Sequence, residues 1–256
     1  MKSLIIGNGE IGKGLFQVLE PVYPAIRIRG LEPLPEGKNG EILNFEFLHI
    51  CFPYSKNFIE EVEKYQDRYL PEHTIIHSTV PVGTSRKCSA SHSPIRGQHP
   101  NMAESIKTFV KYLGGANEEI KKYFENAGIK IKVFNKSETT ELLKILSTTY
   151  YAWNIVFCKE VLRICEDLNL DFDEVYTFPN NTYNDGYKKL GKRSVRRPIL
   201  EPRPGPIKGH CLMQNCELLE DVITKTIIEF NKRYKRSIKE VLKKTAPRAI
   251  FLLVLL

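Results

Sequence analysis

The chain has 256 residues, of which 42% are hydrophobic and 27% are charged, with 16 glycines, 15 prolines and 6 cysteines. This composition is typical of a globular protein and excludes disordered, collagen-like and disulfide-framed mini-protein classes. The formal net charge of +8 indicates an anionic partner, which leaves nucleic acid, a membrane surface and a phosphorylated small molecule open.

Neither end of the chain reads as an export signal or a membrane span. The apolar run after Met1 is short and passes into glycines at Gly7, and the apolar tail at 249–256 is far shorter than the roughly 18–20 residues a span needs. We therefore expect a cytoplasmic protein with no membrane partner and with cysteines that are reduced thiols.

In chain order, the first half alternates short strands with helices. Strands are predicted at 2–6, 25–29, 45–53, 74–80, 91–95 and 129–134, helices from the glycine turn to 19, at 57–69 and at 117–127, and a loop at 30–44. Such alternation predicts βαβ units and a mostly parallel sheet.

The second half is predicted to be helical. One long helical pattern runs over 137–169, a loop rich in Pro, Gly, Asn and Arg covers 177–209, and a final amphipathic helix covers 217–243. The fold class is therefore α/β: a Rossmann-type, mostly parallel sheet in residues 1–135, followed by an α-helical domain with one long central helix in 136–256. The aromatic cluster of Tyr150, Tyr151 and Trp153 on the long helix predicts helix packing and a homodimer seam.

A glycine turn follows the first strand and opens the first helix. Gly7 permits a tight turn, Gly9 lets the backbone approach a pyrophosphate, and Gly12 lets the helix pack closely on the strand. The helix N-terminus adds unpaired N–H groups and the positive end of a dipole. We expect the whole turn to bind a dinucleotide cofactor through Gly7, Asn8, Gly9, Glu10, Ile11 and Gly12.

The acidic residue usual at the end of the second strand is missing. Arg29 stands there, with Glu32 shortly after it. Either Arg27 or Arg29 contacts a 2′-phosphate, which favours NADP, or both lie on the solvated side of an edge strand. We expect NAD as the cofactor, with NADP left open, and Arg29 among the residues that bind it.

Four further segments resemble the UDP-glucose/GDP-mannose dehydrogenase family, in the same order. They are HICFP at 49–53, STVPVGT at 78–84, ELLK at 141–144 and GPIKGHCL at 205–212. The family's third, C-terminal domain, which binds the nucleotide-sugar, has no counterpart in these residues.

The resemblance implies a nucleotide-sugar 6-dehydrogenase chemistry and assigns roles by motif. Cys211 would be the nucleophile that attacks an aldehyde made by a first hydride transfer, and a second hydride transfer and hydrolysis would give a uronate. Lys144 would stabilise negative charge on the oxygen, Thr79 would lie beside the nicotinamide and order water, and Pro53 would join the cofactor site.

The chain departs from the family pattern at three positions. Thr148 replaces an asparagine one turn after the lysine, Asn215 replaces an aspartate four residues after the cysteine, and Ile95 replaces a glutamate. The two lost carboxylates are the groups expected to handle water and protons during hydrolysis. They leave open whether two or four electrons are transferred, with His92, His99 or His210 as alternative bases. His92 and His99 flank a turn and are otherwise expected on the surface.

Basic residues gather in the loop before Cys211. Guanidinium groups suit a diphosphate, so we expect a nucleotide-sugar substrate bound by Arg197, Arg203, Lys208 and Asn215, with Tyr183 and Tyr187 available to stack on its base. No nucleic-acid-binding motif accompanies the loop, so no specific nucleic acid is expected. The spacing of Cys211 and Cys216 is a poor zinc match, and no metal is expected.

The sequence thus predicts an NAD(P)-dependent oxidoreductase that takes hydride from a sugar alcohol, with Cys211 as the covalent nucleophile. A second hypothesis is a non-catalytic, vestigial nucleotide-binding protein. A third is a two-electron dehydrogenase of the hydroxyacid or 6-phosphogluconate type.

Overall fold

The computed structural model describes residues 1–30, 44–97 and 100–236. The chain divides into two compact units, Met1–Ile145 and Leu146–Leu256, each of which is considered by itself. This division lies inside the long helix, whose first turns pack with the sheet. The boundary predicted from the sequence was residue 135, directly after the last strand.

The first unit is built on one seven-stranded sheet of order β2-β1-β3-β4-β5-β6-β7. All neighbouring strands are parallel except β5 and β6, so the expected mostly parallel sheet is confirmed. The strands are β1 (Ser3–Ile6), β2 (Ala25–Ile28), β3 (Phe47–Ile50), β4 (His73–Ile76), β5 (Ser91–His92), β6 (Lys111–Gly114) and β7 (Ile131–Phe134).

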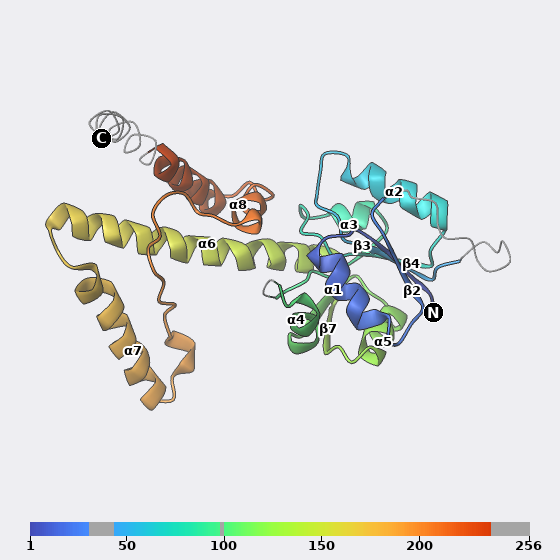
Figure 1. Ribbon diagram of the computed structural model, residues 1–256, viewed down its shortest axis with the longest axis horizontal. Coiled ribbons are helices and arrows are strands. Elements are labelled where there is room, and N and C mark those ends of the chain that lie inside the picture. Colours follow the sequence, from blue (N-terminus) through green and yellow to red (C-terminus); the bar gives the residue numbers. More distant parts are fainter. Residues whose placement is uncertain (31–43, 98–99, 237–256) are drawn as a thin grey trace, which may run out of the picture. The chain divides into compact units, whose positions relative to one another are not determined.

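Helices cover both faces of this sheet (Figure 1). On one face lie α1 (Glu10–Leu19), α4 (Met102–Thr108) and α5 (Glu118–Asn126); on the other lie α2 (Phe58–Tyr69) and α3 (Thr84–Lys87). Side chains alternate between the two faces, so Ile5 packs with the α1 side and Leu4 and Ile6 with the α2 side. Because both faces are covered, β1 and β3 are almost continuous apolar runs.

Between residues 95 and 117 the structure contains two elements that were not predicted from the sequence, α4 and β6; the short helix α3 was also not predicted. Helix α4 packs closely on α1, because Gly14 leaves no Cβ where the Met102 side chain lies. Both elements are short, and the antiparallel pairing of β6 with β5 breaks the βαβ pattern on which the prediction relied.

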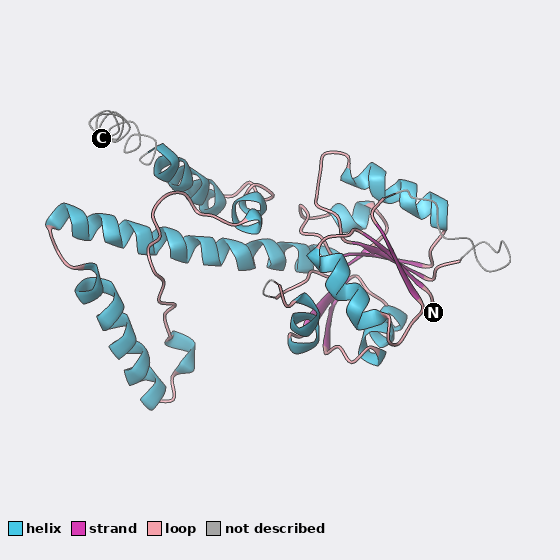
Figure 2. Ribbon diagram, viewed as in Figure 1, coloured by secondary structure: helices cyan, strands magenta, loops and turns pink. Residues whose placement is uncertain are grey.

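The second unit is helical and contains the long helix α6 (Ser137–Leu168) from Leu146 onward. This helix confirms the predicted central helix (Figure 2). After it come the π-helix η1 (Asp173–Thr177), α7 (Phe178–Lys189), the 3-10 turn η2 (Arg193–Val195), α8 (His210–Cys216) and a helix over 222–236. Its apolar core joins α6 to the later segments through Ala152, Val156, Ile207, Cys216 and Ile227.

The predicted loop at 177–209 is wrong in its first part, which is helix α7. Its proline lies in the first turn of the helix, where the missing N–H has no partner to lose. Its asparagines make tertiary hydrogen bonds: Asn180 Oδ1 accepts from Arg197 Nη1, and Asn184 bonds both backbone groups of Arg197. The amino-acid composition of the segment, on which the loop prediction rested, does not predict such contacts.

The predicted helix at 217–243 begins later than expected, at residue 222, after α8 has ended at Cys216. Its last residues and the apolar tail lie outside the described residues. Within the described ranges, no helix combines the length and the apolarity needed to cross a membrane.

Candidate functional site

The glycine turn lies at the carboxyl edge of the sheet, where β1 passes into α1. Gly7 has a φ of +127°, and a Cβ there would lie 3.0 Å from the Cys51 backbone. A Cβ on Gly12 would lie 2.1 Å from the Gly7 carbonyl oxygen. Both positions therefore require glycine for steric reasons alone.

Gly9 differs from the other two glycines because no atom lies within 4 Å of where its Cβ would be. It is the N-cap of α1, and no side chain caps the helix there. The start of this ten-residue helix is therefore open beside Gly9, which is the arrangement that binds a pyrophosphate in dinucleotide folds. The residues present fit such a cofactor.

The ends of neighbouring strands are joined at this turn. Gly7 N donates to the Ile28 carbonyl at 2.8 Å, and Cys51 N donates to the Ile6 carbonyl at 2.8 Å. Arg29 follows β2 directly and Pro53 lies three residues after the end of β3; both are exposed. The structure thus brings the glycine turn and two of the other predicted cofactor residues to one edge of the sheet.

Thr79, half-buried, lies three residues after β4, in the segment beside the one that contains Pro53. The two segments are tied by Ser78 Oγ, which donates to the Phe52 carbonyl at 2.5 Å. Thr79 therefore belongs to the same edge as the glycine turn, at the position where ligands bind in open parallel sheets.

The first turns of α6 are attached to this edge by Glu141, whose carboxylate is fully buried. Its two oxygens accept hydrogen bonds from Gly83 N at 2.5 Å and Ser85 N at 2.7 Å. A buried carboxylate is stable only when such donors replace water. Glu141 had no role predicted from the sequence; its place in an apolar helical run was the available signal.

Lys144 lies one turn further along α6, half-buried, and its Nζ donates to the Ile95 carbonyl at 2.8 Å. Ile95 itself, which replaces a glutamate of the resembled family, is buried with the α1-side core. An apolar side chain in this place cannot exchange protons, so the departure noted in the sequence removes an acid–base group from the vicinity of Lys144.

His92 corrects the expectation of a surface histidine. It is fully buried, with Nδ1 2.8 Å from Thr140 Oγ1 and Nε2 3.1 Å from the Ser78 carbonyl. Burial lowers its pKa to about 3, so the ring is neutral at ordinary pH. His99 lies outside the described residues.

A chain of buried polar groups crosses the α1-side core. His49 Nδ1 is 3.0 Å from His77 Nε2, and His49 Nε2 is 3.0 Å from the Tyr123 hydroxyl, which is 2.6 Å from Ser3 Oγ. Burial lowers the pKa of His49 to about 3, and the pKa of His77 lies well below its usual range for the same reason.

Lys111 adds a buried amine to one end of this chain. Its Nζ lies 3.4 Å from His77 Nδ1 and donates to the Ser93 carbonyl at 3.2 Å. The Phe124 ring centroid is 5.2 Å from the amine. Burial lowers the pKa of Lys111 to about 7, so this side chain is poised between its charged and neutral forms.

Cys211 lies in the second unit, where it is the second residue of α8 and exposed. The short helix begins after Gly209, which has a φ of +111°. An exposed thiol is accessible to a substrate carbonyl. Of the predicted catalytic residues, Thr79 and Lys144 thus belong to the first unit and Cys211 to the second.

Two of the departures from the family pattern contact each other. Asn215, which is buried, donates through Nδ2 to Thr148 Oγ1 at 3.2 Å. The positions of the family's asparagine and aspartate are therefore filled by a matched pair of neutral side chains that links α8 to α6.

The predicted substrate residues fall into two groups. Arg203 and Lys208 line a cavity of about 650 Å³, together with apolar and polar side chains from α6 and from the segment 199–212. Arg197 is instead held on α7: its guanidinium lies 3.6 Å from the Tyr183 ring centroid and donates to Asn180 Oδ1. Arg197 and Tyr183 are thus already engaged with each other.

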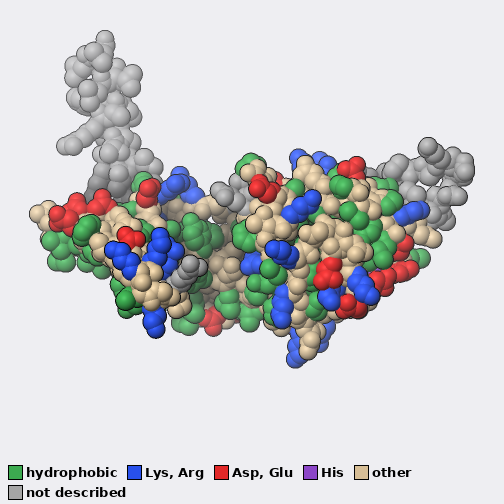
Figure 3. Space-filling view, turned by 90° about the horizontal axis from the view of Figure 1, so that it is seen from below, with side chains coloured by type: hydrophobic (Ala, Val, Ile, Leu, Met, Phe, Trp, Pro, Cys, Tyr) green, Lys and Arg blue, Asp and Glu red, His purple; other side chains and the backbone are tan. Residues whose placement is uncertain are grey.

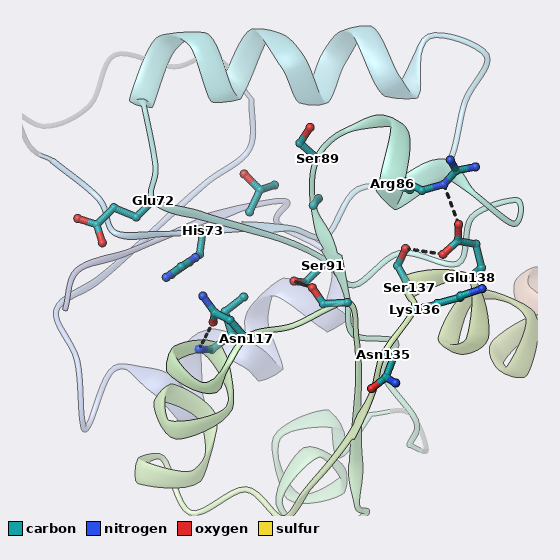
Figure 4. A pocket seen from close by; sticks show the side chains of 14 residues that line it. Glu72, His73, Arg86, Ser89, Ser91, Asn117, Asn135, Lys136, Ser137 and Glu138 are labelled. Carbon is teal, nitrogen blue, oxygen red and sulfur yellow. Dashed lines mark hydrogen bonds and ion pairs between the residues drawn. The ribbon is translucent and has the colours of Figure 1, made fainter.

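A separate cavity of about 770 Å³ lies in the first unit, at the amino end of β4 (Figure 4). His73 and Asn117 line one part of it, and Arg86 forms a 2.7 Å ion pair with Glu138 at another. In parallel sheets, ligands bind at the carboxyl ends of the strands, so this cavity is distinct from the dinucleotide edge.

The fold and the glycine turn define the class of protein, a Rossmann-type, mostly parallel sheet joined to a helical unit. No protein-family profile matches the chain. Among curated proteins, it is 24% identical over 173 residues to the UDP-N-acetyl-D-mannosamine dehydrogenase of Methanocaldococcus jannaschii, covering 62% of this chain and 37% of that protein. It is 24% identical over 150 residues to the enzyme of the same name from Methanococcus vannielii, covering 54% of this chain and 32% of that protein.

Solved structures agree on the fold. A UDP-glucose dehydrogenase from Pyrobaculum islandicum superposes with a TM-score of 0.70 at 14% identity, covering 96% of this chain and 71% of that one. The UDP-N-acetyl-mannosamine dehydrogenase of S. aureus gives 0.63 at 17% identity, covering 95% and 71%. The 3-hydroxyisobutyrate dehydrogenase of Mycobacterium tuberculosis gives 0.61 at 12% identity, covering 91% and 93%.

The chain is related to the UDP-glucose/GDP-mannose dehydrogenase family over part of its length. Its matched segment spans about a third of the length of these curated relatives.

Proposed function

We propose that this chain is an oxidoreductase that binds a nicotinamide dinucleotide and oxidises an alcohol of an anionic, nucleotide-sugar type substrate. The observation that carries the proposal is the glycine turn, in which Gly7 and Gly12 exclude any side chain while Gly9 leaves open space at the uncapped start of α1. The relation to nucleotide-sugar dehydrogenases supports the substrate class.

The bound cofactor would accept a hydride from the alcohol carbon. The chain's own residues would bind and orient the reactants: the α1 N-terminus would hold the pyrophosphate, and Pro53 and Thr79 would border the nicotinamide. Lys144, fixed by its bond to the Ile95 carbonyl, would stabilise negative charge on the substrate oxygen as the proton leaves.

Cys211 is proposed as a nucleophile that adds to the carbonyl carbon after the first oxidation, supported by its exposure and by the GHC motif. Arg203 and Lys208, which line a cavity in the second unit, are proposed to bind the anionic part of the substrate. Arg197 and Asn215 are proposed to contribute to substrate binding indirectly, by holding in place the segments that they contact.

A two-electron reaction is the second candidate, and a specific observation favours it. At the two positions where the resembled family has carboxylates, this chain has the buried Ile95 and Asn215, and Asn215 is hydrogen-bonded to the neutral Thr148. No carboxylate then remains at those described positions to activate water for thioester hydrolysis. The similarity to a 3-hydroxyisobutyrate dehydrogenase fold is consistent with this alternative.

The test is the absorbance of reduced nicotinamide when the purified chain meets NAD⁺ or NADP⁺ and a panel of UDP- and GDP-sugars and hydroxyacids. We expect turnover that Lys144→Ala abolishes while the fold, measured by circular dichroism, survives. Two reduced cofactors per substrate, with Cys211→Ala stopping the reaction, support the four-electron scheme; one per substrate supports the alternative. Binding without any turnover would leave a nucleotide-binding protein that is not an enzyme.

A homodimer is also proposed, through α6. Large apolar side chains at spacings of three, four and seven residues are exposed along this helix: Leu146, Tyr150, Trp153, Phe157, Ile164 and Leu168. Such spacing places them on one helical face. Figure 3 shows hydrophobic and basic side chains intermingled on one side of the helical unit.

A further inference from the structure

We propose that the dinucleotide this chain prefers carries a 2′-phosphate on its adenosine ribose, received by Arg29 with support from Arg27. The inference rests on the proposed function, because it concerns the ligand of the same glycine turn. It goes further by naming the cofactor class, which the sequence alone left open between NAD and NADP.

Arg29 lies directly beside the glycine turn. Ile28, the last residue of β2, pairs with Ile6 in the parallel register, and its carbonyl accepts the hydrogen bond from Gly7 N at 2.8 Å. Arg29 is therefore the residue that follows β2 next to the start of the turn. In dinucleotide folds, the side chain at the end of this strand reads the ribose 2′ position.

The chemistry of this position favours a phosphate. A carboxylate at this position accepts a hydrogen bond from the ribose 2′-hydroxyl and repels a 2′-phosphate. A guanidinium instead donates several hydrogen bonds to a phosphate from its planar, forked group. The segment from Ala25 to Gly30 contains two arginines and no acidic residue. Arg29 is exposed, and no hydrogen bond or ion pair of its side chain is found within the described part of the chain.

Arg27 provides an independent observation. Its guanidinium lies 5.7 Å from the Phe16 ring centroid, and its Nε and Nη1 atoms are buried without a hydrogen-bond partner. Arg27 pairs with Ile5, which packs on the α1 side. Because residues two apart in an extended chain share a face, Arg27 and Arg29 both lie on the α1 side of β2.

The two arginines together favour an anionic ligand at the end of β2. A buried guanidinium with unpaired donors is costly, and a phosphate placed there would offset two positive charges at once. A ribose without the 2′-phosphate would leave both arginine charges without an anionic partner. Glu32, the nearest acidic residue along the chain, lies outside the described residues. Any effect of its charge on the affinity for a 2′-phosphate is included in the binding experiment that follows.

The experiment titrates the purified chain with NADPH and with NADH, following the fluorescence of the reduced nicotinamide, so that no turnover is needed. We expect NADPH to bind more tightly by on the order of tenfold, since a charge-assisted contact of ordinary strength gives that ratio. Adenosine 2′,5′-bisphosphate should compete better than 5′-AMP.

Variants separate the roles of the two arginines. Arg29→Ala should lose the preference for NADPH while leaving the affinity for NADH within about twofold, because the lost contact is to the phosphate alone. Arg29→Lys should retain part of the preference, because it keeps the charge without the fork. Arg27→Met should weaken NADPH binding only. Arg68→Ala, an exposed arginine at the end of α2, is the charge-matched control and should change neither affinity.

The outcomes are distinguishable. Equal or tighter binding of NADH, or a preference for NADPH that survives Arg29→Ala, overturns this proposal and leaves the proposed function standing. Absence of binding by either dinucleotide overturns both.

Discussion

At the scale of single residues, the first unit depends on buried polar groups whose partners come from distant parts of the chain. Ser3, His49 and Tyr123 meet through side-chain hydrogen bonds across three elements. Each such group has given up its hydration, so the protonation equilibrium of a titratable one differs between the folded and unfolded states. That difference makes stability depend on pH.

Lys111 gives a prediction with a definite sign. In the unfolded chain the amine holds its proton up to an ordinary pKa of 10.5, whereas in the folded protein burial lowers the pKa to about 7 and the proton is released above it. Between these values the unfolded state binds more protons, so the free energy of unfolding rises with pH, by up to about 1.4 kcal/mol per pH unit. Urea unfolding at pH 7, 8 and 9 measures the slope.

Lys111→Met provides the comparison for that slope. The variant should lose the rise between pH 7 and 9, and its excess stability over the native protein should be largest at pH 7. Parallel slopes in the two proteins would show that the rise comes from another group.

Glu141 gives the second prediction at this scale. Glu141→Ala leaves the buried N–H groups of Gly83 and Ser85 without acceptors, which should cost on the order of 2–5 kcal/mol of unfolding free energy. Glu60→Ala is the matched control, since its ion pair with Lys64 is exposed and such pairs contribute less than about 1 kcal/mol. Similar losses in both variants would contradict the anchoring role.

At the scale of elements, the turn between β1 and α1 offers a matched pair of substitutions. Gly12→Ala would place a Cβ 2.1 Å from a backbone oxygen, so it should destabilise the fold severely. In Gly9→Ala the added Cβ would have no atom within 4 Å, and the Gly9 backbone angles, φ −71° and ψ −177°, are also allowed for alanine.

Gly9→Ala should therefore keep the melting temperature close to that of the native protein while weakening dinucleotide binding, because its methyl group occupies the space at the start of α1. Thermal unfolding and fluorescence titration measure the two effects on the same sample. Undiminished binding by Gly9→Ala would place the pyrophosphate elsewhere.

Elements also show where sequence reasoning succeeded and failed. Helix α6 was predictable over nearly its whole length, because a long periodic pattern outweighs local propensity. Helix α7 was not, because Pro179, Asn180 and Asn184 are typical of loops. The two asparagines find their partner, Arg197, only in the folded chain.

At the scale of the whole molecule, the proposed homodimer is testable through the exposed apolar side chains of α6. Tyr150 is 64% exposed and Phe157 59% exposed, and burying both against a second copy would be favourable. The double variant with Tyr150→Glu and Phe157→Glu should be monomeric in sedimentation equilibrium at concentrations where the native chain is dimeric. Val22→Glu, an exposed apolar position after α1, should leave the mass unchanged.

The candidate site was only partly predictable at this scale. Gly7, Gly9 and Gly12 could be assigned from their spacing, since backbone sterics act within a few residues. The contact between Asn215 and Thr148 could not, because 67 residues separate its two members. The same holds for Glu141, whose carboxylate meets backbone groups 56 and 58 residues away.

The amino-acid sequence by itself determined the alternation of strands and helices, the dinucleotide turn and the long central helix. Periodicity and glycine spacing are local properties, and local sterics enforce them. Only the tertiary structure decided that His92 is buried and neutral, that Arg197 is held by Tyr183, and that Arg27 has unpaired donors. Burial and pairing depend on which distant segments share a surface, and the charge state of a side chain follows from that environment.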